Sequence, residues 1–377
     1  MSKEPIRILH ITEMLSAAGI ESFIMNVYRN IDREKVQFDF LVLRNEKEFY
    51  EDEITALGGR KYYVHSDVKN TLLRILDESN EIEKFLKKNH YDVVHIHYTT
   101  PLRAFYLKAA AKAGVPVRIY HSHSAEVSGK SNIKLFIYNY CKKVIDKYAT
   151  DFFACSEAAA KWIFSENTLK SKKVKVIHNG IDTDRFSFKK EIRDKVRKNL
   201  SVSNEYVLIN TGRFTEQKNQ TFLIDIVNEL KKNGKNVKLF LLGDGPLKAK
   251  CRDKVDKLGL HDIVYFLGVK ANVEDYLFAA DCYVMPSLYE GLPVAGVEAE
   301  CTGIPCVFSE NITREVKLNE NAIFVGLNTS ALEWSHIVLD KREVKERENA
   351  VKAIRDVGYD IHDVASNMQK FYERRAK

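Results

Sequence analysis

Residues 282–309, CYVMPSLYEGLPVAGVEAECTGIPCVFS, contain the local pattern that decides the fold. An apolar run, 282–287, is followed by a turn, a segment of small residues and a second apolar run, 305–309. Pro293 suits the first position of a helix, and Gly303 is placed to end it. Two apolar strands joined by a helix indicate neighbouring strands of a parallel sheet that is covered on both faces.

The same alternation of apolar runs and helical segments extends through the chain in two series. Helical patterns such as residues 21–31 and 80–89 separate the runs. The first series comprises residues 6–12, 37–43, 61–65, 92–98, 115–121, 151–156 and 174–181, and the second comprises 206–214, 237–245, 263–268, 282–287, 305–309 and 322–326. We therefore predict an α/β protein with two doubly wound, Rossmann-like domains, whose ligands bind beyond the carboxyl ends of the strands.

The domain boundary is expected near residues 179–186, NGIDTDRF, where the last strand of the first series runs out through Asn-Gly. The predicted domains are residues 1–182 and residues 183–359. The final segment, 360–377, has a helical pattern, and we expect it to pack back on the amino-terminal domain.

The composition restricts the class of protein. The 377 residues are 45% hydrophobic and 29% charged, as in soluble globular proteins, and the length suggests two domains. No apolar run approaches the roughly 18 residues of a membrane-spanning helix, and the start of the sequence lacks the apolar core of a secretory signal. Six cysteines are scattered without a Cys-x-x-Cys pair, which favours a reducing cytoplasm.

Positive charge is concentrated in one part of the chain. Residues 101–180 contain 14 Lys and Arg against 5 Asp and Glu. This excess predicts an anionic partner, such as phosphate, nucleic acid or a membrane surface, with an ordinary solvated face as the alternative. Within it, residues 130–149, KSNIKLFIYNYCKKVIDKYA, mix Lys with Phe, Ile and Tyr, as an amphipathic helix at a membrane interface does. A packed helix with basic outer positions would have the same composition.

Two cations follow a predicted strand in residues 209–219, INTGRFTEQKN. Gly212 allows a close backbone approach, and Arg213 and Lys218 then project near the carboxyl end of the strand. Arg binds phosphate oxygens bidentately and Lys supplies a point charge, so the pair suits a diphosphate. The alternative is two solvated surface cations. The next turn, residues 243–246, GDGP, is a weak signal by itself, and the chain has neither a Gly-x-Gly-x-x-Gly fingerprint nor a Walker loop.

Two acids, Glu290 and Glu298, flank the turn and helix of the opening stretch. The helix N-terminus offers free N–H groups and the positive end of the helix dipole, which form a natural anion site. Carboxylates there can accept hydrogen bonds from the vicinal hydroxyls of a sugar or a ribose. Two ordinary surface acids are the alternative, but their apolar neighbours argue against it.

These stretches together resemble the retaining, GT-B fold glycosyltransferases of family four. Four motifs carry the resemblance. They are two glutamates separated by seven residues within residues 286–305, and the stretches TGRFTEQKN, LLGDGP and HNGID. They follow one another along the chain in the order found in the family. Residues 19–32, GIESFIMNVYRNID, resemble members that build bacterial exopolysaccharide and capsule. The resemblance implies a glycosyltransferase that uses a nucleoside diphosphate sugar, most simply a UDP-sugar, and a saccharide or lipid-linked acceptor. It implies no nucleic-acid partner.

The resemblance also assigns roles to single residues. Glu290 corresponds to the residue that contacts the donor sugar, Glu298 to the one that binds the nucleotide ribose, and Arg213 with Lys218 to the pair that holds the diphosphate. The remaining residues of the predicted donor site are Gly19, Gly212, Gly268, Gly291, Leu292, Pro293 and Val294. The family has a Gly-Gly loop after the first strand, whereas this chain has Ala17-Ala18-Gly19 and keeps only the second glycine.

A histidine near the reacting centre is also implied by the resemblance. His121 and His123 point the same way on a strand, and we favour His123 because it lies further towards the strand's end. A zinc site at His121 and His123, or at His95 and His97, would need third and fourth ligands that the neighbouring sequence does not offer.

Asp182-Thr183-Asp184 looks like the Asp-x-Asp metal motif of a different glycosyltransferase fold. It lies in the linker between the predicted domains, so we interpret it as unrelated to catalysis. No metal or other cofactor is then expected, and Arg213, Lys218 and the helix dipole must neutralise the leaving diphosphate.

The expected mechanism is sugar transfer with retention, which is implied by the resemblance. The amino-terminal domain would bind the acceptor and the carboxyl-terminal domain the donor, and closure would exclude water. The expected location is the cytoplasm, with peripheral contact of residues 130–149 on the inner face of the membrane. The rival hypotheses are a GT-B epimerase or hydrolase of the nucleotide sugar, and a non-catalytic nucleotide-sugar-binding module.

Overall fold

The computed structural model describes residues 4–16, 19–124, 132–171, 173–340 and 347–376. The chain divides into two compact units, which we call unit 1, residues 1–180 with 361–377, and unit 2, residues 181–360. The division lies two residues before the boundary expected from the sequence.

Unit 1 contains a seven-stranded sheet in its described residues, with all strands parallel and in the order β3-β2-β1-β4-β5-β6-β7. The strands are β1 (Ile6–Ile11), β2 (Val36–Val42), β3 (Arg60–Tyr63), β4 (Val93–Tyr98), β5 (Val117–Ser122), β6 (Asp151–Ala154) and β7 (Val174–Val176). The helices are α1 (Gly19–Asn30), α2 (Glu51–Ala56), α3 (Thr71–Lys88), η1 (Pro101–Arg103), α4 (Ala104–Lys112), α5 (Asn132–Tyr148), α6 (Glu157–Ile163), α7 (Glu166–Lys170) and α15 (Ile361–Arg375).

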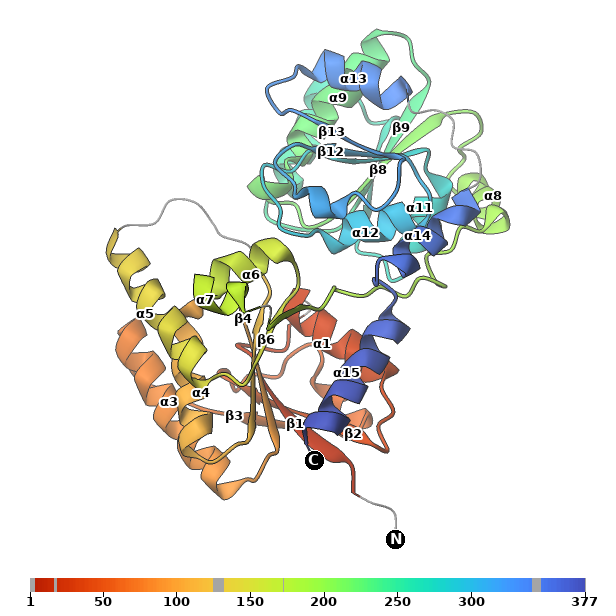
Figure 1. Cartoon of the computed structure of the whole chain (residues 1–377). Helices are drawn as coiled ribbons and strands as arrows, with labels where there is room; N and C mark the ends of the chain where they lie inside the picture. Colours follow the sequence, from red (N-terminus) through yellow and green to blue (C-terminus); the bar gives the residue numbers. More distant parts are fainter. Residues whose placement is uncertain (1–3, 17–18, 125–131, 172, 341–346, 377) are drawn as a thin grey trace. The chain divides into compact units, whose positions relative to one another are not determined.

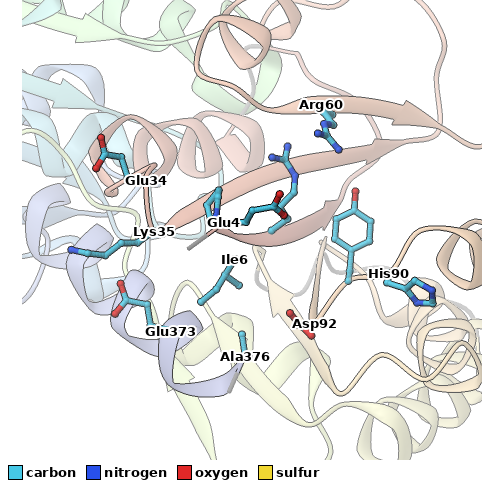
Figure 2. A pocket seen from close by; sticks show the side chains of 12 residues that line it. Glu4, Ile6, Glu34, Lys35, Arg60, His90, Asp92, Glu373 and Ala376 are labelled. Carbon is cyan, nitrogen blue, oxygen red and sulfur yellow. The ribbon is translucent and has the colours of Figure 1, made fainter. Parts of the chain in front are cut away.

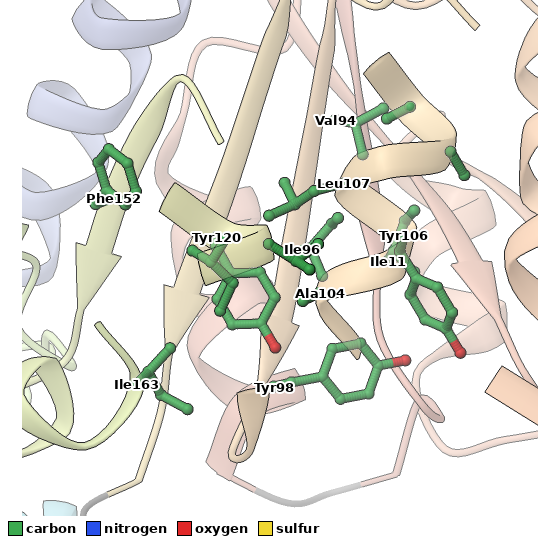
Figure 3. Packing of buried hydrophobic residues seen from close by; sticks show 14 of the residues in the cluster. Ile11, Val94, Ile96, Tyr98, Ala104, Tyr106, Leu107, Tyr120, Phe152 and Ile163 are labelled. Atoms are coloured by element: carbon green, nitrogen blue, oxygen red, sulfur yellow. The ribbon is translucent and has the colours of Figure 1, made fainter. Parts of the chain in front are cut away.

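The helices cover both faces of this sheet (Figure 1). α1 and α15 pack on one face, and α3, α4 and α5 lie side by side on the other. Alternate strand residues feed two apolar clusters, so that Val94 and Ile96 of β4 pack with Leu107 of α4 and Tyr120 of β5, as Figure 3 shows. Because α15 belongs to this unit, the carboxyl-terminal segment completes the core of the amino-terminal one.

Unit 2 repeats the plan with six strands in its described residues, all parallel, in the order β10-β9-β8-β11-β12-β13. The strands are β8 (Tyr206–Thr211), β9 (Val237–Leu242), β10 (Val264–Gly268), β11 (Cys282–Met285), β12 (Cys306–Ser309) and β13 (Ala322–Val325). The helices are α8 (Lys190–Asn199), η2 (Glu216–Lys218), α9 (Gln220–Lys232), α10 (Lys248–Leu258), α11 (Val273–Ala279), α12 (Val294–Cys301), η3 (Arg314–Val316), α13 (Ala331–Asp340), η4 (Arg347–Asn349) and α14 (Ala350–Asp356).

The predicted α/β class and the two doubly wound sheets are confirmed, and every predicted strand has a counterpart in the structure. The helical segment predicted at 80–89 is confirmed as the second half of α3, which begins already at Thr71, where the Asn70 side chain caps the helix by accepting hydrogen bonds from the backbone N–H groups of Leu72 and Leu73. One local prediction was wrong. Pro293 lies one position before the first residue of α12, with extended backbone, and not inside the helix.

The strand order places one switch point in each sheet. It lies between β1 and β4 in unit 1 and between β8 and β11 in unit 2. Chains leave the sheet in opposite directions there, which opens a crevice at the carboxyl ends of the two strands. The loop with Arg213 and Lys218 follows β8, and the loop with Glu290 follows β11. The switch point of unit 2 therefore collects the loops that carry three of the predicted donor residues, Arg213, Lys218 and Glu290.

None of the described helices is both long and apolar enough to cross a membrane. All six cysteines are buried and none forms a disulfide.

Candidate active site

The loops after β8 and β11 are joined by an ion pair at the switch point of unit 2. Lys218 Nζ lies 2.6 Å from Glu290 Oε1, and the two side chains are only 18% and 10% exposed. Sequence reasoning placed both residues in the donor site but did not predict that they contact each other. Lys218 and Glu290, which the sequence placed in two separate loops, are therefore in direct contact at this switch point.

Backbone hydrogen bonds hold these two loops in place. The N–H of Leu288 donates to the carbonyl of Gln217 at 2.8 Å, and Asn219 Nδ2 donates to the carbonyl of Pro286 at 3.1 Å. Asn219 has a left-handed backbone, with φ +54°, which ends η2 and starts α9. The positions of Lys218 and Glu290 are thus set by one backbone hydrogen bond and one hydrogen bond from the Asn219 side chain, and not only by their own attraction.

Glycines bring the ends of β8, β9 and β10 together. Gly243 has φ +128°, and a Cβ at this position would lie 2.1 Å from the carbonyl oxygen of Gly212. Its N–H donates to the carbonyl of Gly268 at 2.8 Å. No side chain fits there, so the residue must be glycine. The predicted donor residues Gly212 and Gly268 thereby become adjacent parts of one glycine-lined edge, to which GDGP contributes more than its weak sequence signal suggested.

Arg213 is exposed at the end of β8. Its guanidinium makes no hydrogen bond or ion pair within the described part of the chain, whereas Lys218 is paired with Glu290. An exposed guanidinium beside a glycine-lined edge can bind an anion without first breaking an internal contact.

Glu298 lies in the middle of α12 and is partly buried. Burial raises the pKa of its carboxyl to about 7, while nearby Arg185 lowers it and Glu274 raises it. Burial also raises the pKa of Tyr283, and the charges of both Glu298 and Glu290 add to this effect. Tyr283 therefore lies within electrostatic reach of both predicted carboxylates, as expected if these face one region.

The loop from Gly291 to Val294 connects Glu290 to α12 and is partly exposed apart from buried Pro293. The N–H groups of Gly296 and Val297 donate to the carbonyl of Pro293 and so are used within the first turn. The earlier N–H groups of Val294 and Ala295 have no such bond in the described residues. They are the donors that remain for an anion.

Glu300 is a carboxylate that sequence reasoning missed. It is 1% exposed, and its Oε2 accepts hydrogen bonds from the backbone N–H groups of Leu318 at 2.9 Å and Asn319 at 2.6 Å. Burial raises its pKa to about 8. The residue ties the segment before β13 to α12, so its role is structural. The sequence did contain a signal for this residue. Glu300 comes two residues after Glu298, and a spacing of two in a helix places its side chain on a different face from that of Glu298.

The residues of Asp182-Thr183-Asp184 contact other parts of unit 2. Asp184 Oδ1 accepts a hydrogen bond from Arg355 at 2.6 Å, and Asp182 Oδ1 accepts one from the N–H of Arg185 at 3.0 Å. Thr183 is buried and its hydroxyl donates to Asp360. These contacts provide a structural reason for the motif.

In unit 1, Gly19 is the first residue of α1, and Ala17 and Ala18 lie outside the described residues. His123 follows β5 and is partly buried, whereas His121 is 0% exposed. Of the two candidate histidines, His123 is therefore the more accessible.

The argument that a zinc site lacks a third ligand was wrong, because the fold supplies one. Nitrogens of His97, His121 and His123 lie within 4.8 Å of one another, and so do those of His10, His95 and His97. Sequence reasoning counted ligands along the chain and could not see neighbours across strands. Most of these ring nitrogens are, however, paired with one another at hydrogen-bond distances of 2.9–3.2 Å, and a metal ion would have to break these contacts; the exceptions include His10 Nε2 and His121 Nε2, which have no hydrogen-bond partner in the described residues.

A separate cavity of about 1010 Å³ lies at the opposite end of the sheet of unit 1, as Figure 2 shows. Its walls include Arg7, the second residue of β1, Asp92, which precedes β4, and Glu373 of α15. Charges of both signs line it, and Arg7 is already paired with Asp39. It is at the amino ends of the strands, where doubly wound folds do not place their active sites.

Comparisons with known proteins identify the family. The description "Glycosyltransferase Family 4" matches residues 17–185, and "Glycosyl transferases group 1" matches residues 191–355. A putative glycosyltransferase of Bacillus subtilis (strain 168), EpsF, is 32% identical over 381 residues, which cover 99% of this chain and 97% of that protein. The chain belongs to the family 4, group 1 glycosyltransferases. The enzyme class predicted from the sequence is confirmed.

Further relatives agree with this assignment. The glycosyltransferase is 27% identical over 316 residues to an Escherichia coli enzyme named UDP-Gal:alpha-D-GlcNAc-diphosphoundecaprenol alpha-1,3-galactosyltransferase, with 81% of this chain and 79% of that protein covered. The crystal structure of Anabaena Alr3699/HepE in complex with UDP superposes with a TM-score of 0.76 at 18% identity, covering 97% of this chain and 99% of the other. This likeness confirms the GT-B fold.

Proposed function

We propose that this glycosyltransferase transfers a sugar from a UDP-sugar to a saccharide or lipid-linked acceptor, with retention at the anomeric carbon, in the synthesis of an exopolysaccharide or capsule. The observation that carries the proposal is the Lys218–Glu290 pair at the switch point of unit 2, 2.6 Å long, together with the exposed Arg213 in the same loop as Lys218. The name of the Escherichia coli relative supports a UDP-linked donor and a lipid diphosphate acceptor.

The donor diphosphate takes its place on the cations of the β8 loop. Arg213 binds two oxygens through its planar guanidinium, and Lys218 leaves Glu290 to contact a third. Negative charge grows on the β-phosphate as the bond to the sugar breaks, and these preorganised cations stabilise it. The N–H groups at the start of α12 add the positive end of a helix dipole.

Glu290 and Glu298 each bind a different part of the rest of the donor. Glu290, released from Lys218, accepts hydrogen bonds from hydroxyls of the transferred sugar, and Glu298 accepts them from the ribose. Glu298 is suited to this task because burial leaves its carboxyl with few competing partners. His123, in unit 1, is the histidine that we assign to the reacting centre, and unit 1 is the acceptor-binding unit of this proposal.

The chemistry needs no metal ion in this proposal. Arg213 and Lys218 supply two positive charges to the diphosphate, and Asp184 is held by Arg355. Turnover should survive an excess of EDTA. Complete loss of turnover that manganese or magnesium restores would contradict this part of the proposal and return Asp182 and Asp184 to consideration.

The main test is turnover with a panel of UDP-sugars, with and without lipid-linked acceptors, in the wild type and in Lys218→Ala. Lys254→Ala is the matched control, because Lys254 forms a pair of equal length, 2.6 Å, with Asp225 elsewhere in unit 2. We expect acceptor-dependent UDP release that falls in Lys218→Ala and not in Lys254→Ala. An α-linked product from an α-linked donor, identified by NMR, establishes retention.

Two outcomes would replace this function by its alternatives. UDP release that is independent of the acceptor indicates a hydrolase, and recovery of an epimeric UDP-sugar indicates an epimerase. Binding of UDP without turnover of any donor would favour a binding module.

The surface of α5 supports a second partner, the inner face of the membrane. Ile133, Phe136 and Tyr140 are 73%, 77% and 56% exposed near the start of this helix, with exposed Lys134 and Lys143 among them. Residues 130 and 131, at the start of the predicted segment, lie outside the described residues. Exposed aromatic and aliphatic groups flanked by lysines are the composition of an interfacial helix.

Vesicle binding tests this partner. Binding should rise with the content of anionic lipid and fall with salt, because exposed charges are screened over about 8 Å at physiological ionic strength. Phe136→Ser should weaken it, whereas Phe49→Ser, which changes a similarly exposed Phe (72%) between β2 and α2, should not. Equal binding to neutral and anionic vesicles would contradict the electrostatic contribution, and equal effects of the two substitutions would contradict the assignment to α5.

A further inference from the structure

Two hydrogen-bonded chains of aromatic rings run through unit 1 across β1, β4 and β5. In the first chain, His10 Nδ1 lies 2.9 Å from His97 Nε2, and His97 Nδ1 lies 2.9 Å from His123 Nε2. In the second, the Tyr372 hydroxyl lies 2.8 Å from His95 Nδ1, and His95 Nε2 lies 3.2 Å from His121 Nδ1. Only the first chain reaches His123, at the carboxyl end of the sheet.

The rings of both chains lie on the sheet face that α1 and α15 cover. Ile8 and His10 on β1 and Val93 and His95 on β4 alternate with residues that pack on the other face. His10 and His97 are 1% and 0% exposed. The proposed transfer gives no role to the polar rings that are buried at this depth.

The histidines of the first chain are neutral. Burial lowers the pKa of His10 and of His123 to about 3, and it lowers the pKa of His97 well below its usual value. A neutral imidazole has one N–H donor and one acceptor nitrogen. Where three such rings bond in series, each donor must face an acceptor, so the proton position on one ring fixes the proton positions on the other two.

The buried end of the first chain selects between the two arrangements. His10 Nε2 is buried without a hydrogen-bond partner in the described residues, and the ring lies 4.1 Å from the ring of Phe38, tilted by 51°. An N–H group can donate weakly to an aromatic ring, whereas a lone pair cannot. Among these aromatic neighbours we place the proton of His10 on Nε2, so that its Nδ1 accepts from His97 Nε2–H. His97 in turn accepts at Nδ1 from His123 Nε2–H.

This arrangement leaves the Nδ1 of His123 unprotonated. We propose that His97, backed by His10, is a positioning residue that holds His123 as the Nε2-protonated tautomer and so presents an Nδ1 acceptor to a hydroxyl of the bound sugar. The inference rests on the proposed function, in which His123 lies at the reacting centre. It concerns how His123 is held, and its central measurement is independent of turnover.

The test compares His97→Phe with His95→Phe in the full-length protein. Both histidines are 0% exposed on β4, and each belongs to one of the two chains, so the substitutions are matched in burial and chemistry. The protein is labelled with ¹⁵N-histidine, and the two ring nitrogens of His123 are assigned by their loss in His123→Asn. Their ¹⁵N shifts report the tautomer and its titration.

In wild type and in His95→Phe we expect His123 as a single Nε2-protonated tautomer. In His97→Phe we expect a mixture of tautomers and titration nearer the ordinary value for histidine, about 6.5. Turnover should fall about tenfold in kcat with little change in the KM for the donor. His97→Gln should restore much of the wild-type pattern, because its amide can accept from His123 and donate to His10.

An unchanged His123 spectrum in His97→Phe would overturn the proposal, and so would equal changes in His97→Phe and His95→Phe. If His97→Phe does not fold, His10→Phe takes its place, since it removes the residue that sets the direction of the chain. Failure of the proposed function has a different signature. In that case His97→Phe shifts the His123 tautomer as expected, while His123→Asn leaves turnover intact.

Discussion

The substitution Glu290→Gln distinguishes two effects of the ion pair at the switch point, its effect on UDP binding and its effect on sugar transfer. In the structure Glu290 occupies Lys218 at 2.6 Å, and both side chains are largely buried. A diphosphate must therefore compete with Glu290 for Lys218. Removal of the carboxylate charge ends that competition, so UDP should bind the variant more tightly even though the variant transfers sugar more slowly.

The magnitude follows from the strength of the contact. The Coulomb attraction of two opposite charges about 4 Å apart is about 1 kcal/mol in water and about 4 kcal/mol at the effective dielectric constant near a protein surface. Only part of this is recovered, because the glutamine dipole still attracts Lys218, and Lys218 retains some contact with water. A gain of about 1 kcal/mol corresponds to roughly fivefold tighter binding of UDP. Turnover should instead fall by about 10²-fold or more, the effect of losing one preorganised contact to the reacting group.

Calorimetric titration with UDP and steady-state rates with the best UDP-sugar measure the two effects in the same preparation. Asp225→Asn is the control, since it neutralises the partner of Lys254 in an equally short pair that lies away from the switch point. It should change neither quantity. Weaker UDP binding in Glu290→Gln would refute the competition, and an equal gain in Asp225→Asn would show that only the net charge of unit 2 matters.

Three further predictions use other residues of the two units. Arg213→Ala should lower turnover by roughly 10²–10³-fold with an unchanged melting temperature, because Arg213 is exposed and makes no side-chain bond in the described residues; a lower melting temperature would show a structural role. Glu298→Gln should weaken UDP and UDP-sugar by the same factor, at most about 10- to 150-fold, and a loss confined to the UDP-sugar would contradict ribose binding. Hydrogen exchange should show unit 1 opening more readily at pH 5.5 than at pH 7.5. The pKa of buried His10 is about 3 in the folded protein and about 6.5 in the unfolded chain, so the stability of unit 1 is lost as pH falls through this window. His10→Phe should reduce the difference between the two pH values.

The pH dependence of unit 2 should have the opposite sign. The folded pKa of Glu298, about 7, lies above its ordinary value, so the folded carboxyl holds a proton that the unfolded one releases. Its contribution to stability is present at low pH and is lost as pH rises through about 7. Glu298 lies within α12, and a thermal-shift series of unit 2 in the full-length protein between pH 5 and pH 8, compared with Glu298→Gln, measures this contribution.

The fold could be predicted from the sequence because it has local signals, and so could the edge of the sheet at which the candidate donor residues lie. Apolar runs alternate with helices, and each parallel strand delivers its following loop to the same edge. The turn after β9 was underestimated, because the reason for Gly243 is the carbonyl of Gly212 on the neighbouring strand. A glycine whose constraint comes from another strand looks the same in sequence as one in any turn.

The pairing of side chains could not be predicted, because it depends on strand order and register. Lys218 meets Glu290 only because β8 lies beside β11. The histidine chains show the stronger form of this limit. The period of two in HIH and HSH places each pair on one face, but the register that aligns His97 with His121 and His10 with His95 brings the strands' rings together. A slip of one residue would turn one strand's histidines to the opposite face and break both chains. The proton position on His123 thus depends on the whole sheet, and no window of sequence contains it.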